Sequence, residues 1–292
     1  MERIEFDTAK FHPKKIMEIR HAFADHPLLQ LPALGELARR LPANQIRYNK
    51  TSTTVHSNMA SAVVEHRHPM HVMDALDNIE TSGTWLILMN VQTIPEYKAL
   101  LHEALASVNA RVGDQDPGMF HRAFWIFIQS PWAVTPYHID HENNFLMQLS
   151  GKKLAQVWQP ELVGFSNKAM ESFHADNDQA DIVYRDDLAS LAANFDMLPG
   201  TGLYMPSTSP HYVANTDCVS IGMSMTFCTA ATHRIETIHR GNRTLRRLGI
   251  KPTPLGTSPA LDQIKYRVFK SYLHNRARLL GKRQDIPGWA RI

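Results

Sequence analysis

The stretch VTPYHIDHENNFLMQLSGKK, residues 134–153, restricts the possible folds of this chain more than any other part of it. Its second half alternates apolar and polar residues, which is typical of a β-hairpin with one buried face. Its first half places two histidines, two acids and two asparagines where a buried strand usually carries Val, Ile or Phe. Buried polar groups are costly unless a partner satisfies them. The stretch therefore predicts a β core that surrounds a polar site.

The β pattern continues on both sides of this stretch, and helical patterns precede it. Helices are expected at 13–41 (restarting after Pro32), 68–80 and 94–112, with a strand at 84–92. From about residue 119, short strand-like runs alternate with turn residues up to about residue 229, with one short helix at 186–195. This order favours a mainly β fold with flanking helices. We expect a double-stranded β-helix (jelly-roll, cupin-like) core rather than a parallel α/β sheet.

The charge distribution separates the C-terminal region from the rest. The net charge is +3. Residues 233–292 contain 14 Lys and Arg and three acids, whereas residues 1–232 contain 17 Lys and Arg and 25 acids. We therefore expect one domain over residues 1–232, with helical and strand elements in 1–118 and the jelly roll in 119–232. A basic helical extension, 233–292, follows. Its apolar stripe favours packing on the barrel or a homodimer over nucleic acid or an anionic membrane surface; the stripe comprises Leu261, Ile264, Val268, Tyr272, Leu279 and Leu280.

Composition excludes several classes of protein. No run of about 18 apolar residues exists, so no membrane-spanning segment is expected. The N-terminus has no apolar signal segment. The only cysteines, Cys218 and Cys228, give no disulfide framework, and a cytoplasmic location is expected.

Two polar residues of the opening stretch have the spacing of metal ligands. His138 and Asp140 lie two apart on a strand, so their side chains point to the same side. A third ligand must come from elsewhere, and His211, after a strand and a turn, is the favoured candidate over His174 and His233. Two histidines and one carboxylate on one face of a metal are typical of non-haem Fe(II) oxygenases.

The wider pattern resembles a known family. The order T-P-x-H-x-D-x-x-x-N-F-x-x-Q-x-x-G-x-K, followed by Y-x-P before a distal histidine, is similar to cupin-like or JmjC-type Fe(II)/2-oxoglutarate dioxygenases. The asparaginyl-hydroxylase-like branch is the nearest in pattern. The resemblance covers roughly residues 120–230.

The resemblance implies roles for six positions. The iron ligands would be His138, Asp140 and His211, and 2-oxoglutarate would contact Thr135, Asn144 and Lys153. A buried Lys153 ammonium would need an anion, which the distal carboxylate of 2-oxoglutarate supplies. Some relatives carry an Asn fifteen residues after the distal histidine. Here that position is Thr226, with Ser224 on the same strand face, so hydroxyls would take its place.

These residues predict an Fe(II)/2-oxoglutarate-dependent dioxygenase that uses O₂ to hydroxylate a C–H bond of a protein side chain or small molecule. CO₂ and succinate would be its co-products. Two alternatives are a catalytically silent jumonji- or cupin-like binding module and a cupin metalloenzyme that does not use 2-oxoglutarate. The intact triad argues against the first alternative, and Thr135 and Lys153 argue against the second.

Several other histidines belong to polar stretches. The cluster of His66, His68 and His71 is interpreted as a polar loop before a helix, although such a loop can also cover a site. His174 and Asp176 repeat the H-x-D spacing without a strand pattern, so a solvated loop is expected there. His141 and Glu142 are expected at the mouth of the substrate pocket.

Overall fold

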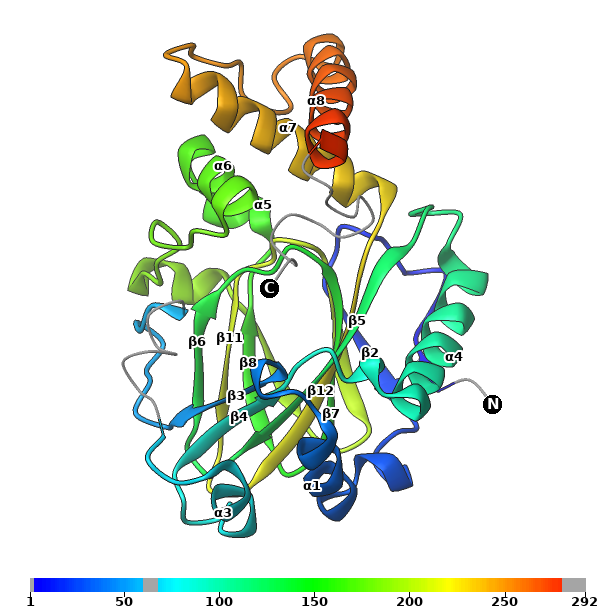
Figure 1. Ribbon diagram of the computed structural model, residues 1–292, viewed down its shortest axis with the longest axis vertical. Coiled ribbons are helices and arrows are strands. Elements are labelled where there is room, and N and C mark those ends of the chain that lie inside the picture. Colours follow the sequence, from blue (N-terminus) through cyan, green and yellow to red (C-terminus); the bar gives the residue numbers. More distant parts are fainter. Residues whose placement is uncertain (1–2, 60–67, 280–292) are drawn as a thin grey trace.

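Two antiparallel sheets face each other in the computed structural model, which describes residues 3–59 and 68–279 (Figure 1). The larger sheet has the order β1(Ile4–Glu5), β2(Met17–His21), β10(Thr201–Met205), β7(Asn143–Ser150), β12(Ser220–Cys228), β5(Phe120–Gln129), β4(Thr84–Leu88), β3(Ile46–Lys50). The smaller sheet has the order β6(Val134–His138), β11(His211–Asn215), β8(Lys153–Val157), β9(Ala193–Met197). This arrangement confirms the predicted mainly β jelly-roll core with flanking helices.

Seven helices flank the two sheets in the described part of the chain. They are α1(Leu31–Arg40), α3(Val72–Asp77), α4(Pro95–Val112), α5(Pro160–Val163), α6(Asn167–Asp176), α7(Ala230–Arg247) and α8(Pro259–Leu279). Short 3-10 helices lie at Pro27–Leu29, Ala43–Gln45, Val91–Thr93 and Asp186–Leu191. The predicted helix at 94–112 is thereby confirmed. The predicted helix at 68–80 and strand at 84–92 are present but shorter, at Val72–Asp77 and Thr84–Leu88. In Figure 1, α7 and α8 stand at the end of the molecule opposite α1 and α3.

Strand alternation divides the core between the two faces of the large sheet. Phe145, Met147 and Leu149 of β7 point outward, into a cluster with side chains of α1 and α4. Leu146 of the same strand points inward, against Val213 of the small sheet. Successive side chains of a strand point to opposite faces, so one strand serves both clusters. The polar residues of the inward face consequently lie between the two sheets.

The prediction of a helix from residue 13 is wrong for its first half. Met17–His21 forms β2, which pairs with β10 and brings Ile19 opposite Gly202. The apolar spacing at 16, 19 and 23 fits a helix, but backbone pairing with a strand far along the chain decides the structure. Leu31–Arg40 is helical as expected. The predicted helix at 186–195 is also only partly correct, because it ends at Leu191 and β9 follows.

The region around His174 is helical, and its prediction as a solvated loop is wrong. His174 lies in α6 and is 3% exposed, with its ring stacked on His239 of α7 at 5.0 Å. Glu171 of α6 is fully buried and accepts two hydrogen bonds from Arg246, at 2.6 and 2.9 Å. Packing of α6 on α7 therefore buries polar residues that look solvated in the sequence, because the residues of α7 that they contact lie more than 60 positions further along the chain.

The described part of the basic extension, up to residue 279, forms a helical hairpin. Phe269 of α8 packs against Gly241 of α7, and Arg234 donates a hydrogen bond to Gln263 across the pair at 2.6 Å. The expected apolar stripe faces outward in this single chain: Leu261, Ile264, Val268 and Tyr272 are 44% to 58% exposed, and Leu279 is 87% exposed. Leu280 lies outside the described residues. In the described part of the chain, no helix is both long and apolar enough to cross a membrane.

Gly241 provides a test of how α8 is held. A methyl group at this position would overlap the Phe269 ring, so Gly241→Ala should destabilise the α7–α8 contact by about 1–3 kcal/mol. Helix propensity alone would make the same change stabilising by about 1 kcal/mol. Gly35→Ala is the matched control, because Gly35 also lies inside a helix and its added methyl would only touch Met73 at 4.0 Å. Denaturant unfolding of both variants measures the difference; equal stabilisation of both would contradict the described packing.

Candidate active site

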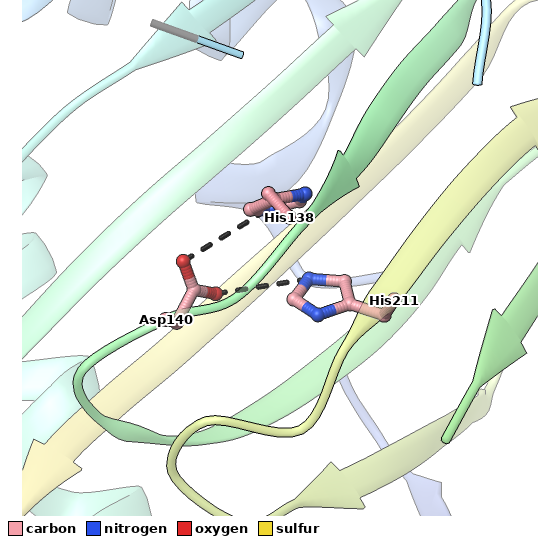
Figure 2. Close-up of side chains that lie close together, drawn as sticks. All are labelled: His138, Asp140 and His211. Atoms are coloured by element: carbon pink, nitrogen blue, oxygen red, sulfur yellow. Dashed lines mark ion pairs between the residues drawn. The ribbon is translucent and has the colours of Figure 1, made fainter. Parts of the chain in front are cut away.

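Three side chains converge between the two sheets in the geometry of a metal site. The Nε2 atoms of His138 and His211 lie 3.8 and 3.7 Å from the two carboxylate oxygens of Asp140 (Figure 2). One ligand atom from each residue lies within 4.8 Å of the others. His138 ends β6 and His211 begins β11, and the two residues are direct partners in the antiparallel ladder. The structure therefore brings the predicted triad together on one face.

The backbone fixes which imidazole nitrogen is available to a metal. Nδ1 of His138 lies 2.7 Å from the carbonyl oxygen of Pro136, and Nδ1 of His211 lies 3.0 Å from that of Ser209. A carbonyl oxygen only accepts, so each Nδ1 carries the proton and each Nε2 presents its lone pair toward Asp140. Burial, followed by the neighbouring His138, lowers the pKa of His211 to about 4. The ring is consequently neutral at physiological pH, as metal binding requires.

Hydrogen bonds fasten the loops that carry these ligands to each other. The Thr208 amide donates to the Asp140 carbonyl at 2.8 Å, and the Ser207 hydroxyl donates to the His141 carbonyl at 2.8 Å. The Asn143 side chain accepts from the Ser207 amide at 2.9 Å. The loop after Asp140 is thus tied to the loop that leads to His211, which holds the ligand geometry.

A buried cation lies on the other side of the same cavity. Lys153 begins β8, is 2% exposed and lines the cavity together with the triad. Burial lowers the pKa of Lys153 to about 8, and no charged group among the described residues offsets that effect. A buried ammonium without a counter-ion is unfavourable. The site therefore fits an anion beside Lys153, as the distal carboxylate of 2-oxoglutarate would be.

Thr135 is prepared to donate a hydrogen bond to such an anion. Its hydroxyl oxygen accepts from Trp85 Nε1 at 3.0 Å and from Gln129 Nε2 at 3.3 Å. With both lone pairs of the oxygen in use, the remaining role of the hydroxyl is to donate its proton. Thr135 and Lys153 both line the cavity, and both would point donors at a carboxylate.

Asn144 and Thr226 form a second polar pair in the cavity. They are opposite each other in the β7–β12 ladder, so their side chains share a face. Asn144 Oδ1 and Thr226 Oγ1 are both buried, and neither has a hydrogen-bond partner within the described residues. Oxygen atoms in this state are rare in folded proteins, and a ligand is a common explanation. These atoms fit contacts to a bound co-substrate; their roles stay predictions.

The remaining expected cavity residues are also close to the site. Ser224, 3% exposed, lines the cavity two residues before Thr226. His141 and Glu142 line it too, with His141 stacked on Phe173 at a centroid distance of 3.8 Å. Burial, followed by the neighbouring Asp140, raises the pKa of Glu142 well above its usual range.

The other histidines have structural surroundings. His174 packs against His239, and His233 lies edge-on to Phe120 at 5.9 Å, so neither belongs to the metal cluster found in the described residues. The His68 ring hydrogen-bonds to the Ser82 carbonyl at 2.9 Å.

The rest of the predicted His66, His68 and His71 cluster is only partly described. Nδ1 of His71 accepts from the Met73 amide at the start of α3. His66 lies outside the described residues, and a covering role for that loop stays a prediction.

Three residues near the anion end were not found from the sequence. Trp85 and Gln129, which orient Thr135, lie within runs that look like ordinary buried strands. Gly222 lies below Lys153: a Cβ at this position would be 2.9 Å from the Lys153 Nζ atom. A glycine inside a strand indicates a bulge or a close approach by another group. The glycine at position 222 could therefore have indicated, from the sequence alone, that another group lies close to this strand.

Gly222 gives a test of the anion end that leaves the triad untouched. The methyl group of Gly222→Ala would displace the Lys153 ammonium, so 2-oxoglutarate should bind about tenfold more weakly, as expected for overpacking of one to two kcal/mol. Titration calorimetry on Mn(II)-loaded protein measures this change. Mn(II) affinity serves as the internal control and should stay the same. Unchanged 2-oxoglutarate affinity would show that Lys153 does not hold the co-substrate from this position.

Comparison with known proteins agrees with the fold. The chain aligns over 94% of its length, at 16% identity and a TM-score of 0.52, with 70% of a structure of Escherichia coli ycfD. A structure of the ribosomal oxygenase YcfD from the same organism, in complex with cobalt and 2-oxoglutarate, aligns at 16% identity and a TM-score of 0.47. That alignment covers 92% of this chain and 66% of the YcfD chain, so this chain spans about two thirds of its length.

A family model locates the domain within the chain. The comparison with curated proteins finds no match. The model of the JmjC domain matches residues 126–234, a range that begins within β5 and ends within α7. This range contains the triad together with Thr135, Asn144, Lys153 and Thr226. Residues 126–234 therefore form a JmjC domain, and the family type predicted from the residue pattern is confirmed.

Proposed function

We propose that this chain is an Fe(II)/2-oxoglutarate-dependent dioxygenase that hydroxylates a C–H bond of its substrate. The observation that carries the proposal is the pairing of two features in one cavity. A facial His138, Asp140 and His211 triad lies at one side, and the buried Lys153 ammonium, without a counter-ion among the described residues, lies at the other. A metal and a dicarboxylate would satisfy both features at once.

The protein contributes positioning. The triad would hold Fe(II) on one face and leave the other positions open to co-substrate and O₂. Lys153 and Thr135 would bind the distal carboxylate, and Asn144 and Thr226 would donate to or accept from the rest of the molecule. Bound Fe(II) with 2-oxoglutarate and O₂ supplies the oxidation of C–H to C–OH, with CO₂ and succinate as co-products. No side chain of the chain is required as a general base.

The two alternatives explain less of the site. A cupin metalloenzyme without 2-oxoglutarate does not need a fully buried lysine in its cavity. It also does not need a glycine at position 222, where a Cβ would lie 2.9 Å from the Lys153 Nζ atom. A silent binding module has no use for two imidazoles whose Nε2 atoms are freed toward one carboxylate by backbone hydrogen bonds. The asparaginyl-hydroxylase-like branch, and the choice between a protein side chain and a small molecule as substrate, stay proposals.

Binding and turnover assays test the proposal. Mn(II)-loaded protein should bind 2-oxoglutarate. Fe(II)-loaded protein supplied with 2-oxoglutarate, O₂ and ascorbate should release succinate slowly even without the primary substrate. Lys153→Ala should weaken 2-oxoglutarate about a hundredfold, because a buried charge-assisted hydrogen bond is lost, while Mn(II) affinity stays the same. His211→Ala should lose the metal first. The proposal fails when metal-loaded wild-type protein binds no 2-oxoglutarate in calorimetry.

We further propose that α8 pairs with a second copy of this chain. Its outward stripe of Leu261, Ile264, Val268 and Tyr272 supports this, because exposed apolar residues at helical spacing are costly in an isolated monomer. Light scattering should therefore give twice the chain mass, and Val268→Glu should give the monomer mass; a monomeric wild type would contradict the pairing.

Nucleic acid and anionic membranes stay less favoured partners. The cytoplasm stays the expected compartment, and both cysteines are unpaired thiols.

A further inference from the structure

Two cations, Arg47 and Lys153, lie at opposite ends of one row of paired strand residues that lines the cavity. The ladder register places Arg47 of β3 opposite Ile87, Ile87 opposite Phe127, and Phe127 opposite Gly222. Directly opposed residues share a face, and Arg47, Ile87 and Phe127 all line the cavity. Lys153 lies over the Gly222 end of the row. Three strand spacings of about 4.8 Å separate the two ends by roughly 14 Å.

Arg47 differs from two other half-buried arginines, Arg243 and Arg246, which are paired with acids. Arg243 and Arg246 each donate to a carboxylate of α6, at 3.0 and 2.6 Å. Within the described residues, the Arg47 guanidinium has no hydrogen bond, ion pair or aromatic ring against it. Burial lowers the pKa of Arg47, and no acid offsets this effect. An arginine keeps its charge in proteins, so a desolvated guanidinium here favours an anion, which no acid of the described residues supplies.

The acids of the cavity do not take this place. Asp140 is directed at the two histidines of the triad, and the pKa of the adjacent Glu142 responds to burial, Asp140 and Glu236, with no contribution from Arg47. Under the proposed function, Lys153 and the metal take both carboxylates of 2-oxoglutarate. Among the described residues that line the cavity, Arg47 is then the cation that neither the metal nor the co-substrate uses.

The wall beside Arg47 defines what the anion would be attached to. Met59, Ile87, Trp125 and Phe127 line the cavity with apolar surface. A guanidinium binds carboxylate or phosphate through two parallel hydrogen bonds, with a geometry that an ammonium does not offer. The arrangement fits a molecule with an apolar or aromatic body and an anionic group at one end.

We propose that Arg47 is a substrate-binding residue that holds a carboxylate or phosphate group of the primary substrate. This inference rests on the proposed function, because it assigns the co-substrate to Lys153 and the substrate to the remaining cation. It makes Arg47 a determinant of specificity for anionic substrates.

Probe binding tests the inference. Full-length protein loaded with Mn(II) and saturating 2-oxoglutarate is titrated with phenylacetate, with phenyl phosphate and with the neutral phenylacetamide, and binding is followed by ligand-observed NMR. At least one anion should bind about tenfold more tightly than the amide, as expected for charge-assisted hydrogen bonds. The stronger of the two anions identifies the group. Arg47→Met should abolish the preference, and Arg47→Lys should keep part of it, because the charge stays while the fork is lost.

The control is Arg122→Met. Arg122 is also half-buried and lies on a strand of the same sheet, but it does not line the cavity. This variant should keep the preference. The inference is overturned by a wild type without anion preference, or by an equal loss of preference in Arg122→Met. It is also overturned when Arg47→Met weakens 2-oxoglutarate as much as Lys153→Ala does, since Arg47 would then belong to the co-substrate.

Failure of the proposed function gives a different result. In that case the metal-loaded protein binds no 2-oxoglutarate, and the probes are titrated in a Lys153→Met background. An anion preference that still depends on Arg47 supports the anion site independently of the reaction, and its absence overturns it.

Discussion

The antiparallel pairing of β11 with its two neighbours is the constraint on which the rest of the site depends. On one side β11 pairs with β6, which sets His211 directly opposite His138. On the other side it pairs with β8, whose first residue is Lys153. One strand in the middle of the small sheet therefore determines the distance between the metal-binding end and the anion-binding end. Backbone hydrogen bonds hold this distance, so it does not rely on flexible side chains.

The cavity contains polar groups that a folded chain would ordinarily avoid burying. Lys153 has no counter-ion within the described residues, and Asn144 Oδ1 and Thr226 Oγ1 have no hydrogen-bond partner there. Each of these groups lowers the stability of the ligand-free protein, since a buried polar atom loses its hydration without compensation. Groups of this kind lie together where a ligand is to be bound. The apolar clusters on the outer faces of both sheets offset this cost.

The sequence predicted most elements correctly where local pattern and tertiary environment agree. The strands from 119 to 229 and the helix at 94–112 show clear periodicity, and the structure has them at those positions. The prediction of a helix over Met17–His21 was wrong because the apolar spacing of this segment also fits a helix, and only pairing with β10 makes it a strand. The prediction of a solvated loop around His174 was wrong. The polar neighbours of His174 suggest exposure to solvent, whereas α7 covers that face with His239 and Arg246.

By itself, the sequence determined the strand-borne part of the site. A two-residue spacing predicts that His138 and Asp140 point to the same side, although β6 ends at His138 and Asp140 lies just beyond the strand. The alternation of the next strand gives Asn144 the inward face. Only the tertiary structure decided how Trp85 and Gln129 orient Thr135 and why position 222 is glycine. It also decided that Arg47 lies in one row with Ile87, Phe127 and Gly222. These relations join strands from separate parts of the chain. Ladder register fixes them through hydrogen bonds between backbones, and no spacing along one sequence encodes that register.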